Sequence, residues 1–577
     1  MGSKLGIHVY RFTSAPEIID FIRRAKPRVV KTVDLDETLL RICRDASPHT
    51  LIIGRLWSES QEYRTDPRNE ARKFCQRRLL PIAEQLRGLV DAWEGYNEGG
   101  RQGPEDLAAY AVFETQRTWL LAEAGFRSVV GNFAPGMPAL EHWEHFLSAL
   151  RAAKVTGGFL GLHEWSAPAL TSLTARDPDL PDKEQEDEGW LTLRYRKVYR
   201  RSLPTDLRDL AVIMTECGID GSVVSDIGHG GWRDLTTADE YLQQLIWYDG
   251  ELQKDPYVLG ACVGPYGGGG TSWDSYDIKG EMATKLAAYL IEHPADPWAE
   301  GSTPLTVEQR LLAALAVGFG EQFADYRKML PQKGEYTHRP LEKIRYLVIH
   351  HTGAGTTPQT HSSTLAKSQI EERGWPAINL HFLVYPDQVR YVGSLDTSRP
   401  HIHGYNDEAI GIALVGDFDQ EPPSASTIAL TARLCRVIEH QLGRTLARRG
   451  HHDLTLAGET TCPGSTAYGP HGWLAQLEAK AEAKSAPLRS RVTSRDRKSK
   501  RQQVPLSAQD ESLSSIESLR RQRQQIRRNL DHLQEQRAKH GVDVPLILLN
   551  EIDEQEQRLE QIEAELAQLE QSPPTTE

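Results

Sequence analysis

The stretch YLVIHHT, residues 346–352, decides how the second half of the chain is organised. Leu347, Val348 and Ile349 form a continuous apolar run, so both faces of the segment are expected to be buried, as in an inner strand of a sheet. The run ends in His350 and His351. A histidine at the end of a buried strand is either a hydrogen-bonded group at the edge of the core or a ligand.

Two later motifs carry side chains of the same kind. The sequence GHHD at residues 450–453 holds a second pair of histidines, and TTCPG at residues 460–464 holds a cysteine. Two imidazoles and one thiolate, with a fourth position open, are a recognised ligand set for catalytic zinc. The three motifs together favour a metal site.

In this order the motifs resemble those of the zinc-dependent N-acetylmuramoyl-L-alanine amidases, a family that includes phage-type amidase lysozymes and peptidoglycan recognition proteins. The resemblance covers about residues 340–480, and it extends to LHF at 380–382, HIHGYN at 401–406 and IGIALVG at 410–416. Apolar runs and helical patterns alternate through this region, which predicts an α/β domain with a mixed sheet.

The resemblance implies roles for particular residues. By motif matching, His350, His451 and Cys462 would hold Zn2+, Thr460 would be catalytic, and His401 would contact the substrate. The implied reaction is hydrolysis of the amide between the lactyl group of muramic acid and the first residue of the stem peptide. Zinc would polarise the carbonyl and lower the pKa of the attacking water.

The general base that is usual in this family is missing. Some members carry a tyrosine where this chain has Leu380, and others carry a glutamate where it has Ala413. Zinc-bound water can react with a weaker base or another carboxylate, so Glu459 or Asp417 could take that part. The alternative is a peptidoglycan-recognition domain that holds zinc without turnover.

Composition bounds what the whole chain can be. Its 577 residues are too many for one core, and 39% hydrophobic and 25% charged residues suit a soluble multidomain protein. A net charge of −13 argues against a nucleic-acid-binding protein. The six cysteines lack framework spacing, so we expect them to be reduced and the protein to be made in the cytoplasm.

The sequence shows neither of the two hydrophobic signals that direct a protein to or across a membrane. The start MGSKLGIHVYRF has no secretory hydrophobic region, and no apolar run is long enough to span a bilayer. We therefore expect no signal peptide and no membrane anchor. Release to a cell wall would need lysis or a non-Sec export route.

Eight short apolar segments recur before residue 303, and amphipathic helical patterns separate most of them. Eight strand–helix repeats are typical of a (β/α)8 TIM barrel, whose functional residues lie at the carboxyl ends of the strands. The segments are residues 5–10, 29–34, 51–57, 91–98, 127–133, 158–165, 210–218 and 258–264.

Acidic residues fall at two of these ends, Glu98 in the fourth segment and Glu216 in the seventh. This arrangement resembles the retaining glycoside hydrolases of the large (β/α)8 clan. The resemblance implies that Glu98 is the acid/base, Glu216 the nucleophile, Asn97 a partner of the sugar 2-substituent, and His163 a ligand of the site. A solvated loop acid or an ion-pair partner is the alternative for each glutamate alone.

Several neighbours could complete such a cleft. Aromatic rings stack on sugar faces, and the candidates are Trp165, Trp232 and Trp273. Arg55 could bind a carboxylate or a sugar oxygen, or pair with Glu94 or Glu216. Glu164 could be a third acid of the cleft or a salt-bridge partner.

The last part of the chain changes character. Residues 484–507 are rich in arginine, lysine and serine, which predicts a disordered linker that is either a solvated tether or an attractor of anionic polymers. Residues 508–571 carry two amphipathic patterns around Gly541 and Pro545, which predicts an antiparallel coiled-coil hairpin. Two helices bury little surface alone, so we expect this hairpin to form a homo-oligomer or bind a partner.

The sequence therefore predicts a bifunctional peptidoglycan hydrolase with Zn2+ as cofactor and peptidoglycan or muropeptides as partners. Its predicted parts are a glycoside-hydrolase-like barrel at 1–303, a helix and linker at 304–340, a zinc amidase-like domain at 341–483, a basic linker at 484–507 and a helical hairpin at 508–571. The alternatives are a non-catalytic muropeptide sensor assembled through its tail, and an enzyme that recycles imported muropeptides.

Overall fold

The computed structural model describes residues 2–12, 15–58, 60–171, 187–224, 227–268, 273–298, 304–456 and 459–482, together with Leu559 and Glu563. The predicted linker at 484–507 lies outside the described residues, and so does the hairpin at 508–571 apart from these two positions. No helix among the described residues is long and apolar enough to cross a membrane.

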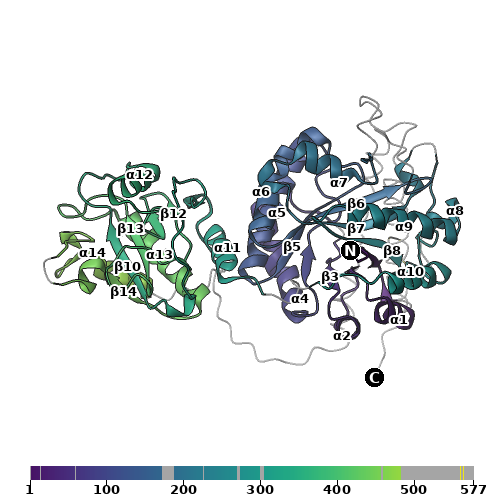
Figure 1. Cartoon of the computed structure of the whole chain (residues 1–577), viewed down its shortest axis with the longest axis horizontal. Coiled ribbons are helices and arrows are strands. Elements are labelled where there is room, and N and C mark those ends of the chain that lie inside the picture. Colours follow the sequence, from purple (N-terminus) through teal and green to yellow (C-terminus); the bar gives the residue numbers. More distant parts are fainter. Residues whose placement is uncertain are drawn as a thin grey trace, which may run out of the picture. The chain divides into compact units, whose positions relative to one another are not determined.

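Eight parallel strands close into a barrel in the first part of the chain (Figure 1). Each of the eight expected segments overlaps one strand, and pairing of β1 with β8 completes the ring. The prediction of a (β/α)8 barrel is confirmed. The strands are β1 (Leu5–Val9), β2 (Val29–Thr32), β3 (Leu51–Gly54), β4 (Ala92–Glu94), β5 (Arg127–Phe133), β6 (Phe159–Ser166), β7 (Val212–Ile219) and β8 (Val258–Tyr266).

Helices cover the outside of the barrel (Figure 1). The longest is α5, whose buried face carries Tyr110, Phe113 and the ion pair of Glu114 with Arg117. The helices are α1 (Ala15–Ala25), α2 (Glu37–Ala46), α3 (Pro67–Phe74), α4 (Leu80–Gln85), α5 (Pro104–Glu123), α6 (Leu147–Val155), α7 (Arg194–Lys197), α8 (Trp232–Leu235), α9 (Ala238–Gln253) and α10 (Glu281–Glu292).

A second domain is built on a six-stranded mixed sheet with the order β14-β10-β13-β11-β12-β9. We call it the mixed-sheet domain. Strands β14, β10, β13 and β11 run parallel, and β12 is antiparallel to β11. The strands are β9 (Phe323–Asp325), β10 (Tyr346–His351), β11 (Phe382–Val384), β12 (Val389–Tyr391), β13 (Ala409–Leu414) and β14 (Ala447–Gly450), and the helices are α12 (Ser362–Arg373), α13 (Ala425–Leu442) and α14 (Trp473–Glu482). The expected mixed sheet is confirmed.

The segment at 304–340 differs from the expected helix and linker. Helix α11 (Val307–Phe319) stops at Gly320, whose φ of 56° lies in the left-handed region that favours glycine. Strand β9 follows and pairs with β12 at the edge of the sheet. The stretch that reads as a linker also packs against the domain, because Arg339 is buried there and bonds to the carbonyl oxygens of Leu395 and Ala409. Strand β9 and the stretch around Arg339 therefore belong structurally to the mixed-sheet domain.

Candidate metal and acid sites

The order of the strands brings the two histidine motifs together. His350 is the next-to-last residue of strand β10, and β14 lies beside this strand in parallel, with Ile349 opposite Gly450. A parallel pair places both carboxyl ends at the same edge of a sheet. The short 3-10 helix that begins at His451 therefore starts next to His350, and the two imidazole rings lie 4.7 Å apart between centroids.

Cys462 completes the cluster from the loop after β14. Its Sγ lies 3.6 Å from His350 Nδ1, and one ligand atom from each of His350, His451 and Cys462 lies within 4.8 Å of the other two. Metal–ligand distances of about 2.0–2.3 Å in a tetrahedron put neighbouring ligand atoms about 3.5 Å apart. The three residues therefore fit a zinc ion with one position left for water or substrate.

The neighbouring histidines hold the cysteine loop in place. The His351 amide donates to Cys462 Sγ at 3.4 Å, and the His452 amide donates to the Cys462 carbonyl oxygen at 2.8 Å. The ring of His452 contacts the carbonyl oxygen of Thr460 at 2.8 Å. His351 and His452 thus position the loop from outside the ligand cluster.

Burial keeps the two histidines of the cluster in the form that binds metal. Burial lowers the pKa of His350 well below its usual value, and the charges of His401 and His451 lower it further. Burial also lowers the pKa of His451. Both imidazoles are therefore neutral at pH 7 and have a nitrogen lone pair to offer.

His401 lies behind His350 and is buried, and the substrate contact that the resemblance implies for it stays a prediction. Its Nδ1 lies 3.0 Å from His350 Nε2, and its Nε2 lies 3.2 Å from the carbonyl oxygen of Ala409. The ring contacts a ligand of the cluster on the side away from Cys462.

The positions of the missing base are filled by apolar side chains. Leu380 and Ala413 are both buried. The carboxylate of Glu459 accepts from the Leu456 amide, and Asp417 Oδ1 lies 3.9 Å from His351 Nδ1. Either carboxylate would have to turn from these partners to act on water at the cluster.

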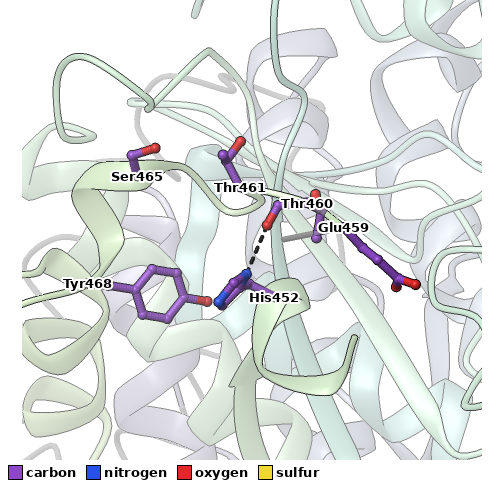
Figure 2. Close-up of a pocket in the computed structure, with 6 residues that line it drawn as sticks. All are labelled: His452, Glu459, Thr460, Thr461, Ser465 and Tyr468. Carbon is purple, nitrogen blue, oxygen red and sulfur yellow. Dashed lines mark hydrogen bonds between the residues drawn. The ribbon is translucent and has the colours of Figure 1, made fainter. Parts of the chain in front are cut away.

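A pocket of about 550 Å³ opens beside the cysteine loop, and Figure 2 shows the six residues that line it. They are His452, Glu459, Thr460, Thr461, Ser465 and Tyr468. Thr460 Oγ1 accepts from the Cys462 amide, which leaves the hydroxyl proton of Thr460 to be donated elsewhere. Four of the six lining side chains carry a hydroxyl group.

The barrel holds a second set of functional side chains. One buried apolar cluster takes residues from seven strands and includes Val29, Leu51, Ile53, Ala92, Val129, Phe159, Ile213 and Cys262. Side chains alternate along a strand, so the residue two positions further on shares the same face. This alternation puts charged residues above the apolar cluster, toward the carboxyl end, at Lys31, Arg55 and Glu94.

A bulge in β7 brings Glu216 to this layer. Leu162 is opposite Met214, but the next residue, His163, is opposite Glu216, so β7 has one extra residue, Thr215. A bulge of this kind re-aims the side chains that follow it. Without the extra residue, Thr215 would lie where Glu216 does.

Cations surround Glu216. Lys31 Nζ lies 2.7 Å and Arg55 Nη1 lies 3.1 Å from its Oε1. Burial alone would raise the pKa of Glu216, but the charges of His163, Lys31, His8 and Arg55 outweigh burial and hold it well below its usual value. Glu216 is therefore ionised at neutral pH, as a nucleophilic carboxylate must be.

Glu98 and Glu216 meet at the two sides of one imidazole. His163 Nδ1 lies 2.7 Å from Glu98 Oε1, and His163 Nε2 lies 3.7 Å from Glu216 Oε1. Glu98 also pairs with Arg101, and its φ of 52° is uncommon for a residue with a side chain. Asn97 contacts Arg55 through its Oδ1. The structure thus brings together the four barrel residues expected for a glycosidase site, Asn97, Glu98, His163 and Glu216.

The other candidates for the cleft are three tryptophans and Glu164. Trp165 is buried, and Trp232 is buried and stacked on Tyr241 with ring centroids 5.4 Å apart, so neither ring offers a free face to a sugar. Trp273 is 39% exposed, and its ring packs against Tyr276 with ring centroids 5.1 Å apart. Glu164 is buried and accepts from the amides of Leu193 and Tyr195 and from the Tyr248 hydroxyl, so it is not an acid of the cleft.

Two further buried residues belong to the barrel site: His8, which was not singled out from the sequence, and Glu94, which was expected only as a possible partner of Arg55. His8 follows an apolar residue in β1, and its burial lowers its pKa well below the usual value. Glu94 is fully buried and lies 3.1 Å from Lys31 Nζ. Only the alternation of β1 and β4, applied with the barrel already known, could have placed them.

Comparison with known proteins relates the mixed-sheet domain to the amidase family that its motifs resemble. Residues 340–465 match the N-acetylmuramoyl-L-alanine amidase family. The chain is 31% identical over 142 residues to peptidoglycan recognition protein 3 of Homo sapiens, covering 23% of this chain and 41% of that protein. It is 27% identical over 150 residues to peptidoglycan-recognition protein LB of Drosophila melanogaster, covering 24% of this chain and 62% of that protein.

Among solved structures, the endolysin from Thermus scotoductus MAT2119 bacteriophage Ph2119 is 26% identical, with a TM-score of 0.24, and the match covers 28% of this chain and 98% of that one. The chain thus spans less than two thirds of either recognition protein, and the family match is confined to the mixed-sheet domain.

Proposed function

We propose that the mixed-sheet domain is a zinc-dependent N-acetylmuramoyl-L-alanine amidase that acts on peptidoglycan or muropeptides. The observation that carries the proposal is the convergence of His350, His451 and Cys462 from three separate segments. A zinc ion bound by them would polarise the scissile carbonyl and lower the pKa of a water molecule. The match of residues 340–465 to the amidase family supports this chemistry.

The remaining residues would bind and orient the substrate. Thr460 lines the pocket next to the cluster, and its hydroxyl can donate to a substrate oxygen, such as the carbonyl of the amide. The fixed amides of His351 and His452 keep the cysteine loop at the distance that the cluster requires. Thr460 is therefore the residue of this domain that we assign to catalysis beside the metal ligands.

Incubation of purified muropeptides with the protein, followed by mass spectrometry, tests the amidase. Wild type should release the free stem peptide, and His350→Ala should release none. His403→Ala is the matched control, because His403 is exposed and lies outside the cluster. Intact muropeptides after incubation with zinc-loaded wild type contradict an enzyme.

A peptidoglycan-binding domain without turnover is the second candidate for the same site. The burial of Leu380 and Ala413 at the usual base positions favours it, and peptidoglycan recognition proteins are among the relatives. Binding of muropeptides without release of the stem peptide in the same experiment would establish this candidate in place of the amidase.

For the barrel we propose a retaining glycosidase that acts on the glycan of the same polymer. Glu216, held ionised by Lys31 and Arg55, would be the nucleophile, and Glu98 the acid/base. The approach of both carboxylates to His163 supports placing them in one site. Wild type should release reducing ends from purified walls, and Glu216→Gln should not. Walls that yield equal reducing ends with both proteins contradict the assignment.

A further inference from the structure

We infer that His401 is a positioning residue that fixes the tautomer and the orientation of His350, so that His350 Nδ1 faces the metal position. This inference rests on the proposed zinc site. It assigns His401 a role toward the ligand cluster instead of toward the substrate.

The hydrogen bonds define a direction for the protons. His401 Nε2 lies 3.2 Å from the carbonyl oxygen of Ala409, which can only accept, so this nitrogen carries the proton. His401 Nδ1 of the neutral ring is then an acceptor and receives the proton of His350 Nε2 at 3.0 Å. His350 Nδ1 is left with a lone pair, and it is this atom that lies 3.6 Å from Cys462 Sγ.

The surroundings hold the His401 ring in this position. The amides of His401 and Ile402 both donate to Asn406 Oδ1, which fixes the backbone that carries the ring. The ring lies over Gly411 of β13, where an added Cβ would come within 2.9 Å of His401 Cγ. A side chain at residue 411 would therefore displace the ring, and the glycine gives it room.

The carbonyl oxygen of Ala409, which accepts from His401, has a second hydrogen-bond donor. The carbonyl oxygen of Ala409 also accepts from Arg339 Nη1 at 2.7 Å. Loss of the His401 ring would therefore leave this oxygen bonded. Removal of His401 deprives His350 of its acceptor without leaving the Ala409 oxygen unpaired.

Zinc affinity of the full chain, measured by competition with a chelator, tests the role. Groups that orient a metal ligand are typically worth 10- to 100-fold in metal affinity. His401→Leu, which cannot accept a hydrogen bond, should weaken zinc binding by about that factor. His401→Asn, which keeps an acceptor near the Nδ1 position, should recover most of the loss. His403→Leu is the matched control, since His403 is exposed in the same loop, and its affinity should equal that of wild type.

A spectroscopic measurement separates positioning from a general loss of structure. Cobalt in place of zinc should give a changed d–d spectrum in His401→Leu and in Gly411→Ala, but not in His403→Leu. In the metal-free wild type, nitrogen NMR should find the proton of His350 on Nε2, and this result needs no variant.

The possible results separate the role of His401 from the proposed zinc site on which it rests. A wild type that binds no zinc overturns the metal site and the inference together. A wild type that binds zinc, with His401→Leu equal to it in affinity and cobalt spectrum, overturns the inference alone. If His401→Leu does not fold, a proton found on Nδ1 of His350 in wild type overturns the inference.

Discussion

Replacement of Lys31 by methionine should destabilise the barrel strongly. Lys31 is fully buried between Glu94 at 3.1 Å and Glu216 at 2.7 Å, and Glu94 is fully buried as well. Removal of one partner from a buried ion pair costs about 3–5 kcal/mol because the remaining charge stays in the interior unpaired. Arg55, 3.1 Å from Glu216 and 3.8 Å from Glu94, remains as partial compensation, which favours the lower end of that range.

The pH dependence of this effect has a defined sign. In wild type the folded pKa of Glu216 is held below the usual 4.5, so its contribution to stability is present above that value and is lost as pH falls through the folded pKa. Without Lys31 the folded pKa rises, and the carboxylate can take up a proton at higher pH. The difference in unfolding free energy between wild type and Lys31→Met should therefore be largest at pH 7 and shrink toward pH 4.5.

Urea unfolding of the full chain, followed by tryptophan fluorescence at several pH values, measures this difference. Lys285→Met is the matched control, because Lys285 pairs with Asp239 at the surface and such pairs are worth about 0–1 kcal/mol. Lys31→Met with Glu94→Gln removes one charge of each sign and should recover part of the loss. A loss below about 1 kcal/mol at pH 7, or one that grows toward pH 4.5, would refute the electrostatic account.

Three further outcomes follow from the packing and from the proposed sites. Gly6→Ala should unfold the barrel at lower temperature, because the new Cβ would lie 1.8 Å from the carbonyl oxygen of Val29, whereas Gly250→Ala in α9 meets nothing within 4 Å and should raise the melting temperature. Removal of zinc by a chelator should lower the unfolding free energy of the mixed-sheet domain, by about 2.7 kcal/mol relative to zinc at a hundred times its Kd, as calorimetry can measure. Glu98→Gln should reduce the release of reducing ends as severely as Glu216→Gln, while Glu164→Gln should leave the kcat of the barrel within a few-fold of wild type.

The barrel could be predicted from the sequence because each strand of a parallel barrel is buried on both faces and reads as an apolar run. The same logic found β10 and placed His350 at its end. Short polar strands contain no apolar run, so the sequence did not reveal them. Strand β14 has the sequence ARRG, and β9 has only three residues, so pairing with distant partners decides both.

The candidate site was predictable where residue type and strand position together decided the chemistry. Tryptophan suits a core as well as a cleft, so the sequence could not separate the buried Trp165 and Trp232 from the exposed Trp273. His401 reads as a loop residue, and its burial against His350 depends on the space above Gly411, which only the packing of β13 reveals.

The zinc content of the purified chain tests the central claim most directly. After incubation with zinc and desalting, elemental mass spectrometry should find one zinc per chain in wild type and in His403→Ala, because His403 is exposed and lies outside the ligand cluster. His451→Ala combined with Cys462→Ala should retain none. A wild type without zinc, or a double variant that carries as much zinc as wild type, would contradict the account.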